Sequence, residues 1–354
     1  MKQLVLNAAR RRRFRSAPIF TLLALLAAPV AGIGGQKGDF TWSWGNTVSY
    51  GLIWRLDDPD PAIIGRTAGG SAFSVNGDDG NLNYETGIAS SAVKWTSELE
   101  FSYKNFGGFV RGFSFYDQEN EDQDRARTPL SDDAMERVGS RAEIRDAFVW
   151  YRFDLGARPG EVRVGAVLLS VKPSDNTSIE AYYQFDWEET KIDPVGSYFS
   201  TTDLAGAGAE KVMLGFGSAP DSIPVWFNIP GNPVGVAVPR GADREAGDSG
   251  QYGAAFRLFA PGLGGTEFGF YYLNYNSRLP VIMARTGTAA GVLSRGNYAS
   301  TARYFLEYPE DITLYGLSFN TQLGRSGIAL QGEISHRQDV PLQVDDVELL
   351  YAAL

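Results

Sequence analysis

Residues 40–55, with the sequence FTWSWGNTVSYGLIWR, decide the fold class of this chain. The even-numbered positions from 40 to 54 are large and apolar except for Asn46, and most residues between them are small or polar. Successive side chains of a β-strand point to opposite faces, so this stretch predicts one long strand with an apolar, aromatic face and a polar face. A helical period does not produce this segregation, and the stretch is far longer than an ordinary strand of roughly five or six residues.

The same alternation recurs along the rest of the chain and predicts an all-β protein. After the N-terminal segment, no apolar run reaches the roughly 18 residues of a membrane helix, and no segment has the pattern of a long amphipathic helix. The predicted strands after residue 55 are 93–104, 146–155, 161–170, 179–187, 251–260, 266–277, 302–308, 313–322, 328–336 and 343–352.

Aromatic residues stand repeatedly on the apolar faces of these strands. They are typical of the girdles where an outer-membrane barrel meets the two bilayer interfaces, whereas a soluble β protein, the alternative, would turn its charged faces to bulk water. Because unpaired backbone groups are costly in hydrocarbon, a sheet in a membrane has to close. We therefore predict an antiparallel transmembrane β-barrel of outer-membrane type. The predicted lipid-interface aromatics are Trp42, Trp44, Trp54, Trp95, Tyr103, Tyr183 and Trp187.

The connections between the predicted strands alternate between short and long. Short connections are expected on the periplasmic side and long ones outside. Successive strands run in opposite directions, and counting them places the longest connection, 189–250, on the periplasmic side. Either a strand is therefore missing between Gly165 and Ile179, or part of 211–217 is a strand. The short connections are 105–108, 156–160 and 261–265, and the long, acidic ones are 56–90, 117–141 and 189–250.

Residues 1–32 have the features of a secretory signal peptide. Five arginines between Arg10 and Arg15 precede a short apolar core at 19–28, and small residues follow at 30–32. The core is too short to span a bilayer, so we expect this segment to be removed on export and residues 33–354 to form the mature protein. The predicted location is the outer membrane.

Composition excludes several functional classes. All six basic residues of the first 32 positions come without an acid, so the remainder carries 26 basic and 42 acidic residues and cannot form the basic surface of a nucleic-acid binder. The chain has no Cys and a single His, His336, which excludes thiol chemistry and His-cluster metal sites. The stretch 247–250, GDSG, resembles a serine-protease nucleophile, but only His336 can serve as its base. We predict no enzyme activity and no cofactor.

Charged and amide residues on the polar faces are the best candidates for functional residues. They point into the lumen if the alternation is interpreted correctly, where they either form ladders across strands or set pore selectivity. The acidic excess predicts a weak cation preference. The lumen-facing candidates are Lys94, Glu98, Glu100, Arg152, Arg163, Glu180, Gln184, Asp186 and Arg257.

Two acidic stretches are candidates for ion binding. Residues 76–81, NGDDGN, offer oxygen ligands to calcium but lack the spacing of a helix–loop–helix site, so we interpret them as a solvated turn and predict no metal. Residues 117–124, DQENEDQD, are predicted to be an exposed loop. Bridging of lipopolysaccharide through divalent ions at this loop is the alternative.

Several segments resemble one Gram-negative outer-membrane family, catalogued as domain of unknown function 1302. The resemblance implies an outer-membrane β-barrel, often found in bacteria that degrade sterols, alkanes or aromatic compounds, and carries over no catalytic or binding residue. The family usually has a longer stretch where this chain has residues 165–178, and it usually continues beyond the segment matched at the C-terminus, so we expect a shortened member whose barrel is incomplete. The segments are 72–84, 97–99, 105–112, 182–187, 248–253, 308–312, 314–321 and 345–349.

These observations predict an outer-membrane channel for passive uptake of small compounds. The apolar or aromatic nature of the solute is implied only by the resemblance. The expected partners are outer-membrane lipid, lipopolysaccharide and a small-molecule solute. The alternative is a non-conducting surface scaffold or adhesin that uses its acidic loops.

Overall fold

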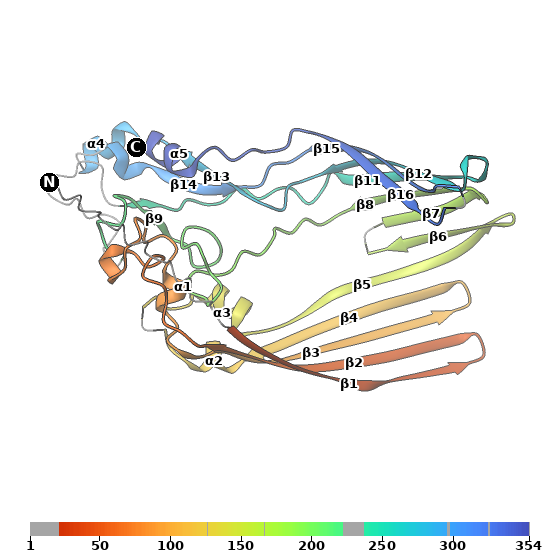
Figure 1. Cartoon of the computed structure of the whole chain (residues 1–354), viewed down its shortest axis with the longest axis horizontal. Coiled ribbons are helices and arrows are strands. Elements are labelled where there is room, and N and C mark those ends of the chain that lie inside the picture. The colour runs from red at the N-terminus through yellow and green to blue at the C-terminus, as the bar shows by residue number, and fades with distance from the viewer. Residues whose placement is uncertain are drawn as a thin grey trace, which may run out of the picture.

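A single antiparallel sheet of twelve strands dominates the computed structural model (Figure 1). The structure describes residues 21–125, 127–165, 167–221, 237–295, 298–324 and 326–353. Each strand pairs with the next strand of the sheet along the chain, as in a meander. The strands, in order, are β1 (Thr21–Lys37), β2 (Phe40–Arg55), β3 (Gly87–Tyr103), β4 (Phe106–Asp117), β5 (Ser140–Leu155), β6 (Arg158–Val164), β7 (Val167–Ser174), β8 (Thr177–Gln184), β11 (Gln251–Ala260), β12 (Thr266–Tyr275), β15 (Ile312–Gln322) and β16 (Ala329–Gln338).

The sheet does not close into a barrel. Within the described residues, β1 and β16 are its two edges and do not pair with each other. Nearly every residue of β16 is exposed, as expected for a strand with one neighbour. Figure 1 shows β1–β5 along one side of the molecule and β8, β11, β12, β15 and β16 along the other, with β6 and β7 between them. The prediction of an all-β antiparallel protein is therefore confirmed, whereas a closed wall is not found.

The two ends of the sheet differ in the length of their connections. At one end, tight turns follow β1, β3, β5 and β7, and slightly longer turns follow β11 and β15. At the other end, the connections after β2, β4, β8 and β12 are long (Figure 1). This segregation is the one predicted from the sequence, and we call the long connections, together with the residues after β16, the loop layer.

The predicted strand 161–170 is wrong, because the chain reverses direction within it. Residues on both sides of Gly165 form the separate strands β6 and β7, in which Val162 lies opposite Leu169. This reversal adds the strand that was missing between Gly165 and Ile179. The longest connection, the one after β8, therefore lies at the same end as the other long connections. The alternative strand at 211–217 is only β9 (Lys211–Met213), which pairs with β10 (Ala237–Pro239) outside the main sheet.

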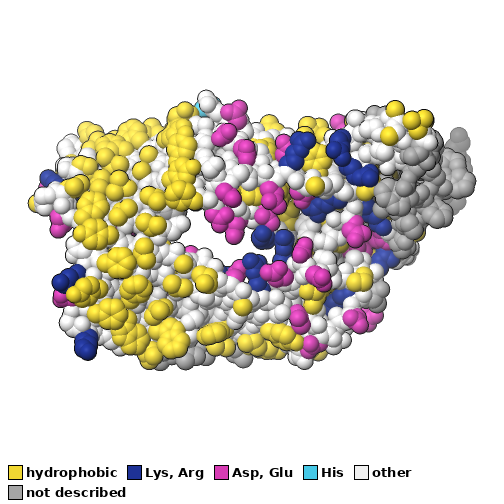
Figure 2. Space-filling model, turned by 180° about the vertical axis from the view of Figure 1, so that it is seen from behind, with side chains coloured by type: hydrophobic (Ala, Val, Ile, Leu, Met, Phe, Trp, Pro, Cys, Tyr) yellow, Lys and Arg dark blue, Asp and Glu magenta, His cyan; other side chains and the backbone are white. Residues whose placement is uncertain are grey.

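The β6–β7 hairpin is short relative to its neighbour β5. Strand β6 pairs with β5 only between Val149 and Leu155, so residues 140–148 of β5 have no ladder partner on that side. Figure 2, seen from behind, shows an opening between the two halves of the molecule, bordered by charged side chains. The expected shortening near 165–178 thus coincides with the hairpin that leaves part of β5 without a neighbouring strand.

The buried apolar residues lie mainly in the loop layer and not on the sheet. Tyr304, Leu306 and Val238 are almost fully buried there, and they belong to two neighbouring clusters. The remaining elements of the loop layer are β13 (Val281–Arg285), β14 (Arg303–Glu307), η1 (Arg66–Ala68), α1 (Asp79–Leu82), α2 (Gln118–Asp122), α3 (Asp132–Val138), α4 (Ala289–Arg295), η3 (Tyr298–Thr301) and α5 (Asp346–Ala352); η2 (Pro261–Leu263) lies in a turn at the opposite end.

Three further predictions differ from the structure. The predicted strand 343–352 contains helix α5, because Asp345 caps its first turn by accepting a hydrogen bond from the Glu348 N–H and Leu350 packs into the loop layer. The predicted strand 302–308 is β14, but it pairs with β13 outside the main sheet. The acidic stretch 117–124 is not a simple exposed loop, since its Asp117 is buried and caps α2.

The predicted signal peptide lies partly outside the described residues. Residues 1–20 are not described, and residues 21–32 belong to edge strand β1, which pairs with β2 along its length. Removal of residues 1–32 stays a prediction; it would leave only residues 33–37 of this strand. In the described part of the chain, none of the helices has the length and apolar character needed to span a membrane.

Candidate functional site

One face of the main sheet, here called the apolar face, carries large exposed apolar side chains. The strand register places Trp44 opposite Leu99, and Leu99 opposite Val110, so these side chains share one face across β2, β3 and β4. The same face continues to β16, where Ile334 lies opposite Leu317. Figure 2 shows hydrophobic side chains spread over the strand-rich half of the molecule and charged ones concentrated towards the loop layer. The exposed residues of the apolar face include Trp44, Val48, Tyr50, Trp54, Val93, Trp95, Leu99, Tyr103, Val110, Val149, Tyr151, Val164, Leu169, Ile179, Tyr252, Phe256, Phe270, Tyr315, Leu317 and Ile334.

Six of the seven predicted interface aromatics lie on the apolar face. Trp42 and Tyr183 are half-buried there, and Trp44, Trp54, Trp95 and Tyr103 are exposed.

Trp187 differs from this prediction. It lies three residues beyond the end of β8, is only 6% exposed and packs edge-on against Tyr308, with ring centroids 4.9 Å apart. The alternating pattern of 179–187 runs past the end of the strand, so periodicity alone assigned this residue to the wrong environment.

The opposite face of the sheet, here called the polar face, carries ion pairs that cross neighbouring strands. Arg111 on β4 binds Glu98 on β3 at 2.7 Å and Asp146 on β5 at 2.8 Å. Arg257 on β11 binds Glu180 on β8 at 2.9 Å.

Glu161 on β6 is shared between two arginines of the polar face. It accepts hydrogen bonds from Arg152 on β5 at 3.0 Å and from Arg163 on β6 at 2.9 Å. These side chains are partly exposed, and exposed pairs of this kind each stabilise a fold by only about 0–1 kcal/mol. These ion pairs therefore contribute little to the stability of the sheet.

The structure brings together five of the nine predicted lumen-facing residues in these ion pairs. Lys94, Glu100 and Gln184 lie on the same face, whereas Asp186 lies in the loop layer beyond the end of β8. The sequence prediction omitted Arg111, Asp146 and Glu161, although the same alternation places them on the polar face. The five ion-paired residues are Glu98, Arg152, Arg163, Glu180 and Arg257.

A row of aromatic rings lies between the arginines of the polar face. Phe109 and Phe148 stack with centroids 5.3 Å apart, and Trp150 follows Phe148 at 5.9 Å. The guanidinium groups of Arg111 and Arg163 lie over Phe109 and Phe148, at 5.3 and 4.6 Å from the ring centroids. Phe109 and Phe148 are half-buried and present planar apolar surface with positive charge beside it, whereas Trp150 is buried behind them at 6% exposed.

The segment 75–84 joins several loops of the loop layer. Asn76 makes a reciprocal pair with Met213: its amide donates to the Met213 carbonyl at 2.9 Å, and its oxygen accepts from the Met213 N–H at 2.6 Å. Asn83 binds Thr128 in the same reciprocal way, and the Tyr84 hydroxyl donates to the Asn120 side chain at 2.6 Å. Each residue thus fixes a different loop to this segment.

Glycines in the same segment permit close approach of another loop. A Cβ at Gly77 would lie 2.7 Å from the Thr201 carbonyl oxygen, and one at Gly80 would lie 2.9 Å from the Ser200 carbonyl oxygen. Both positions therefore need a residue without a side chain, because the opposing atoms belong to the backbone.

The interpretation of 76–81 as a solvated turn is wrong. Asp78 is 1% exposed and Asp79 is 7% exposed, and both lie close to Asp203 from the connection after β8. Burial raises the pKa of Asp203 to about 7, and the nearby carboxylate of Asp79 adds to this shift. Burial likewise raises the pKa of Asp79 to about 6.

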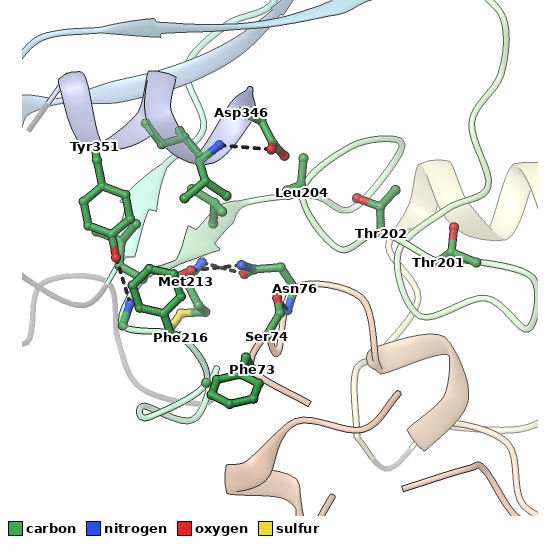
Figure 3. Close-up of a pocket in the computed structure, with 16 residues that line it drawn as sticks. Phe73, Ser74, Asn76, Thr201, Thr202, Leu204, Met213, Phe216, Asp346 and Tyr351 are labelled. Atoms are coloured by element: carbon green, nitrogen blue, oxygen red, sulfur yellow. Dashed lines mark hydrogen bonds between the residues drawn. The ribbon is translucent and has the colours of Figure 1, made fainter. Parts of the chain in front are cut away.

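A pocket of about 300 Å³ lies between this segment and helix α5 (Figure 3). Its walls include Leu204 and Met213. Exposed rings stand at its side: Phe216 and Tyr351 are nearly parallel, 12° apart with centroids separated by 6.0 Å, and Phe73 lies nearby. The pocket offers aromatic and aliphatic surface with few charged groups.

The serine-protease-like stretch does not form a catalytic group with His336. Ser249 lies just before β11, whereas His336 lies on β16, and β12 and β15 separate these two strands in the sheet. His336 lies opposite Tyr315, on the apolar face.

Comparison with known protein families decides the membership of the chain. The family model described as "Protein of unknown function (DUF1302)" matches residues 13–166 and 164–354. This chain belongs to the DUF1302 family. The resemblance identified from the sequence segments is thereby confirmed. Neither the curated proteins nor the solved structures contain a match.

In this DUF1302 protein, the matched segments fall into two structural groups. Segments 105–112, 182–187 and 314–321 contribute to β4, β8 and β15 of the main sheet. Segments 72–84 and 345–349 lie in the loop layer, on either side of the pocket.

Proposed function

We propose that this DUF1302 protein is an outer-membrane channel for passive uptake of small apolar or aromatic compounds. The observation that carries the proposal is the apolar face, which continues across the sheet and exposes tryptophans, tyrosines and aliphatic residues. Soluble monomers rarely expose contiguous apolar patches larger than a few hundred Å², whereas a lipid-facing wall needs such a surface. Lipid is therefore the partner whose chemistry suits this face.

The polar face supports a path for solutes on the other side of the same wall. Its charges are held in ion pairs, and the half-buried rings of Phe109 and Phe148 add planar apolar surface. A path of this kind admits water and still gives aromatic compounds a surface to contact. Liposome swelling tests it directly: a channel lets small solutes through, whereas a scaffold or adhesin gives no swelling with any solute.

The pocket beside α5 supports small apolar or aromatic compounds as the class of solute. Aromatic rings on a cavity of about 300 Å³ suit a small aromatic or aliphatic molecule better than a sugar or an ion. The Tyr351→Ala variant is expected to weaken uptake of a monocyclic aromatic compound several-fold and to leave uptake of glycerol unchanged. The matched control is Phe199→Ala, which removes an exposed aromatic side chain outside the pocket. Equal uptake by both variants would remove the pocket from the proposal.

A channel also requires that the edges of the sheet be paired in the bilayer, since each unpaired backbone group in hydrocarbon costs several kcal/mol. The chain has no Cys, so introduced cysteines report on closure without background. Lys37 and Ala329 stand at the same end of the two edge strands, whereas Gln338 stands at the opposite end of β16. In liposomes, a short bis-maleimide is expected to join Lys37→Cys to Ala329→Cys within one chain, and not Lys37→Cys to Gln338→Cys. Joining only between chains would show that another copy covers the edges.

A further inference from the structure

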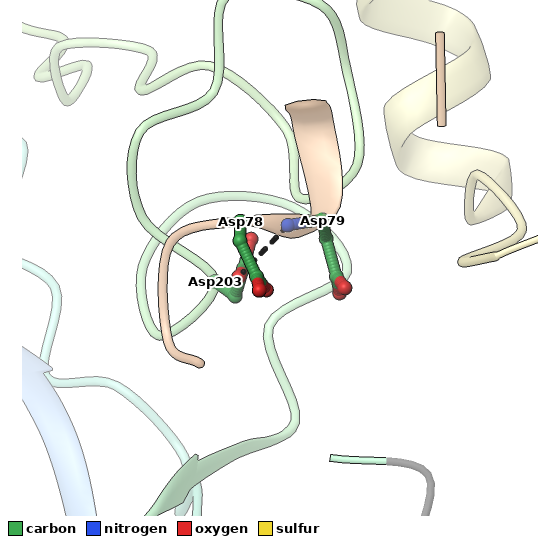
Figure 4. A group of neighbouring side chains, drawn as sticks. All are labelled: Asp78, Asp79 and Asp203. Atoms are coloured by element: carbon green, nitrogen blue, oxygen red, sulfur yellow. Dashed lines mark hydrogen bonds between the residues drawn. The ribbon is translucent and has the colours of Figure 1, made fainter. Parts of the chain in front are cut away.

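Three aspartates from two loops meet in the loop layer (Figure 4). Asp78 and Asp79 come from the connection after β2, and Asp203 comes from the connection after β8, 124 residues further along the chain than Asp79. One carboxylate oxygen from each lies within 4.8 Å of the others. Figure 4 shows the carboxylates of Asp78 and Asp79 projecting to the same side.

The hydrogen bonds of these carboxylates leave one oxygen of each without a hydrogen-bond partner. Asp78 Oδ2 accepts from the Gly65 N–H at 2.7 Å, and Asp203 Oδ2 accepts from the Asp79 N–H at 3.3 Å. Within the described residues, the Oδ1 atoms of all three are buried without a hydrogen bond, and Asp79 Oδ1 lies 3.6 Å from the Arg127 guanidinium. Asp78 is 99% buried, so its free oxygen has no access to bulk water.

The surrounding charges do not neutralise the cluster. Arg127 is shared with a fourth carboxylate, Asp221, and Lys211 donates to the backbone carbonyl of Asp221. Among the described residues, these four carboxylates carry an excess of two negative charges over the two basic groups when all four are ionised. A cavity of about 470 Å³, lined by Asp79, Asp203 and Asp221, gives access to this group.

We propose that Asp78, Asp79 and Asp203 bind one divalent hard cation, with calcium as the best fit. Calcium takes several oxygen ligands at about 2.3–2.6 Å in flexible geometry, so three carboxylate oxygens within 4.8 Å of one another can contact one ion, and waters from the cavity complete its shell. The ion supplies two positive charges to these ionised carboxylates and gives the buried aspartates a partner. Magnesium is a poorer fit because it demands near-ideal octahedral geometry and keeps most of its waters.

The site has a structural consequence for the loop layer. Its ligands belong to the two connections that segment 75–84 already holds together, so the ion fixes the connection after β8 to the connection after β2. Neither ligand group lies on the sheet, and the site does not depend on whether the protein conducts solutes.

The experiment uses the full chain, purified in detergent without lipopolysaccharide and stripped of metal with a chelator. Calorimetric titration with calcium chloride is expected to give one equivalent of bound calcium, with magnesium binding at least about tenfold more weakly. The isosteric variant Asp203→Asn is expected to lose at least about tenfold in calcium affinity. The matched control Asp58→Asn, which removes an exposed carboxylate from the same connection as Asp78, is expected to bind like the unmodified protein.

Thermal unfolding separates loss of the ion from loss of the fold. In chelator, Asp203→Asn is expected to unfold at the same temperature as the unmodified protein or above it, because the variant removes one of three carboxylates that repel one another. Calcium is expected to raise the unfolding temperature of the unmodified protein and of Asp58→Asn, and not that of Asp203→Asn. Absence of stoichiometric heat, equal calcium binding by Asp203→Asn, or equal affinity for magnesium would overturn the proposal; protons shared among the carboxylates would then account for the cluster.

Discussion

Replacing Glu161 by glutamine frees two arginines of the polar face at once. Glu161 is the shared partner of Arg152 and Arg163, with hydrogen bonds of 3.0 and 2.9 Å. Glutamine keeps the size of the side chain and one acceptor oxygen but removes the negative charge. The local formal charge of this group of three side chains therefore rises from +1 to +2.

The size of the effect follows from Coulomb's law. A monovalent ion that passes about 6 Å from the altered charge, in water, gains or loses about 0.7 kcal/mol. Screening with a Debye length of about 10 Å at 0.1 M salt reduces this to about 0.4 kcal/mol. Because anions gain what cations lose, the anion-to-cation permeability ratio is expected to rise about fourfold at 0.1 M salt, and by less than about twofold at 1 M, where the Debye length is about 3 Å.

The assay is the reversal potential of a planar bilayer containing the protein, measured under a KCl gradient at low and at high mean concentration. The matched control is Asp175→Asn, which removes the same charge from an ion pair with Arg158 at the β7–β8 turn, where the aspartate side chain is 94% exposed. The control is expected to change the ratio less than Glu161→Gln. A ratio that Glu161→Gln leaves unchanged, or changes equally at both salt concentrations, would refute the assignment of the polar face to the solute path.

Two further predictions concern the loop layer, and both are checked by thermal unfolding in detergent. Gly80→Ala is expected to destabilise the protein by about 1–3 kcal/mol, because the added Cβ would overlap backbone oxygens of the loop at Ser200. The control is Gly45→Ala, whose Cβ would meet nothing within 4 Å, and it should destabilise the protein by less than about 1 kcal/mol. Tyr84→Phe is expected to cost about 1 kcal/mol through loss of the buried hydrogen bond to Asn120, and an unchanged stability would show that this bond does not hold α2 in place.

The alternation of side chains predicted the strands of the sheet well where a strand is long and has one apolar face. The pattern at 40–55 corresponds to β2 residue for residue, and the patterns at 251–260 and 313–322 correspond to β11 and β15 within one residue. It failed at the β6–β7 reversal, because residues 166–169 are apolar at both parities and only Gly165 marks the turn. It also failed at 343–352, where a capped helix replaces the expected strand.

The candidate sites were harder to predict than the strands. Period-two alternation assigns Arg152, Arg163 and Glu161 to the polar face, but it does not show that Glu161 is the shared partner of the two arginines. The cluster of Asp78 and Asp203 joins residues from separate connections, and no local pattern reports such a contact. The only local signal was the run of two aspartates between glycines, which is equally typical of a solvated turn.

For the proposed outer-membrane channel, the short β6–β7 hairpin limits how a bilayer can surround the protein. Seven residues of β6 at about 3.4 Å per residue, inclined by about 45°, rise about 17 Å, against the apolar band about 25 Å tall of an outer-membrane wall. By the same measure, β1–β5 rise above this band, whereas β6 ends within it. In the proposed channel, the bilayer beside this hairpin would have to thin locally or meet the interior above the rim, and a hydrophobic solute would have a sideways exit into the membrane there, besides the passage through the full length of the structure.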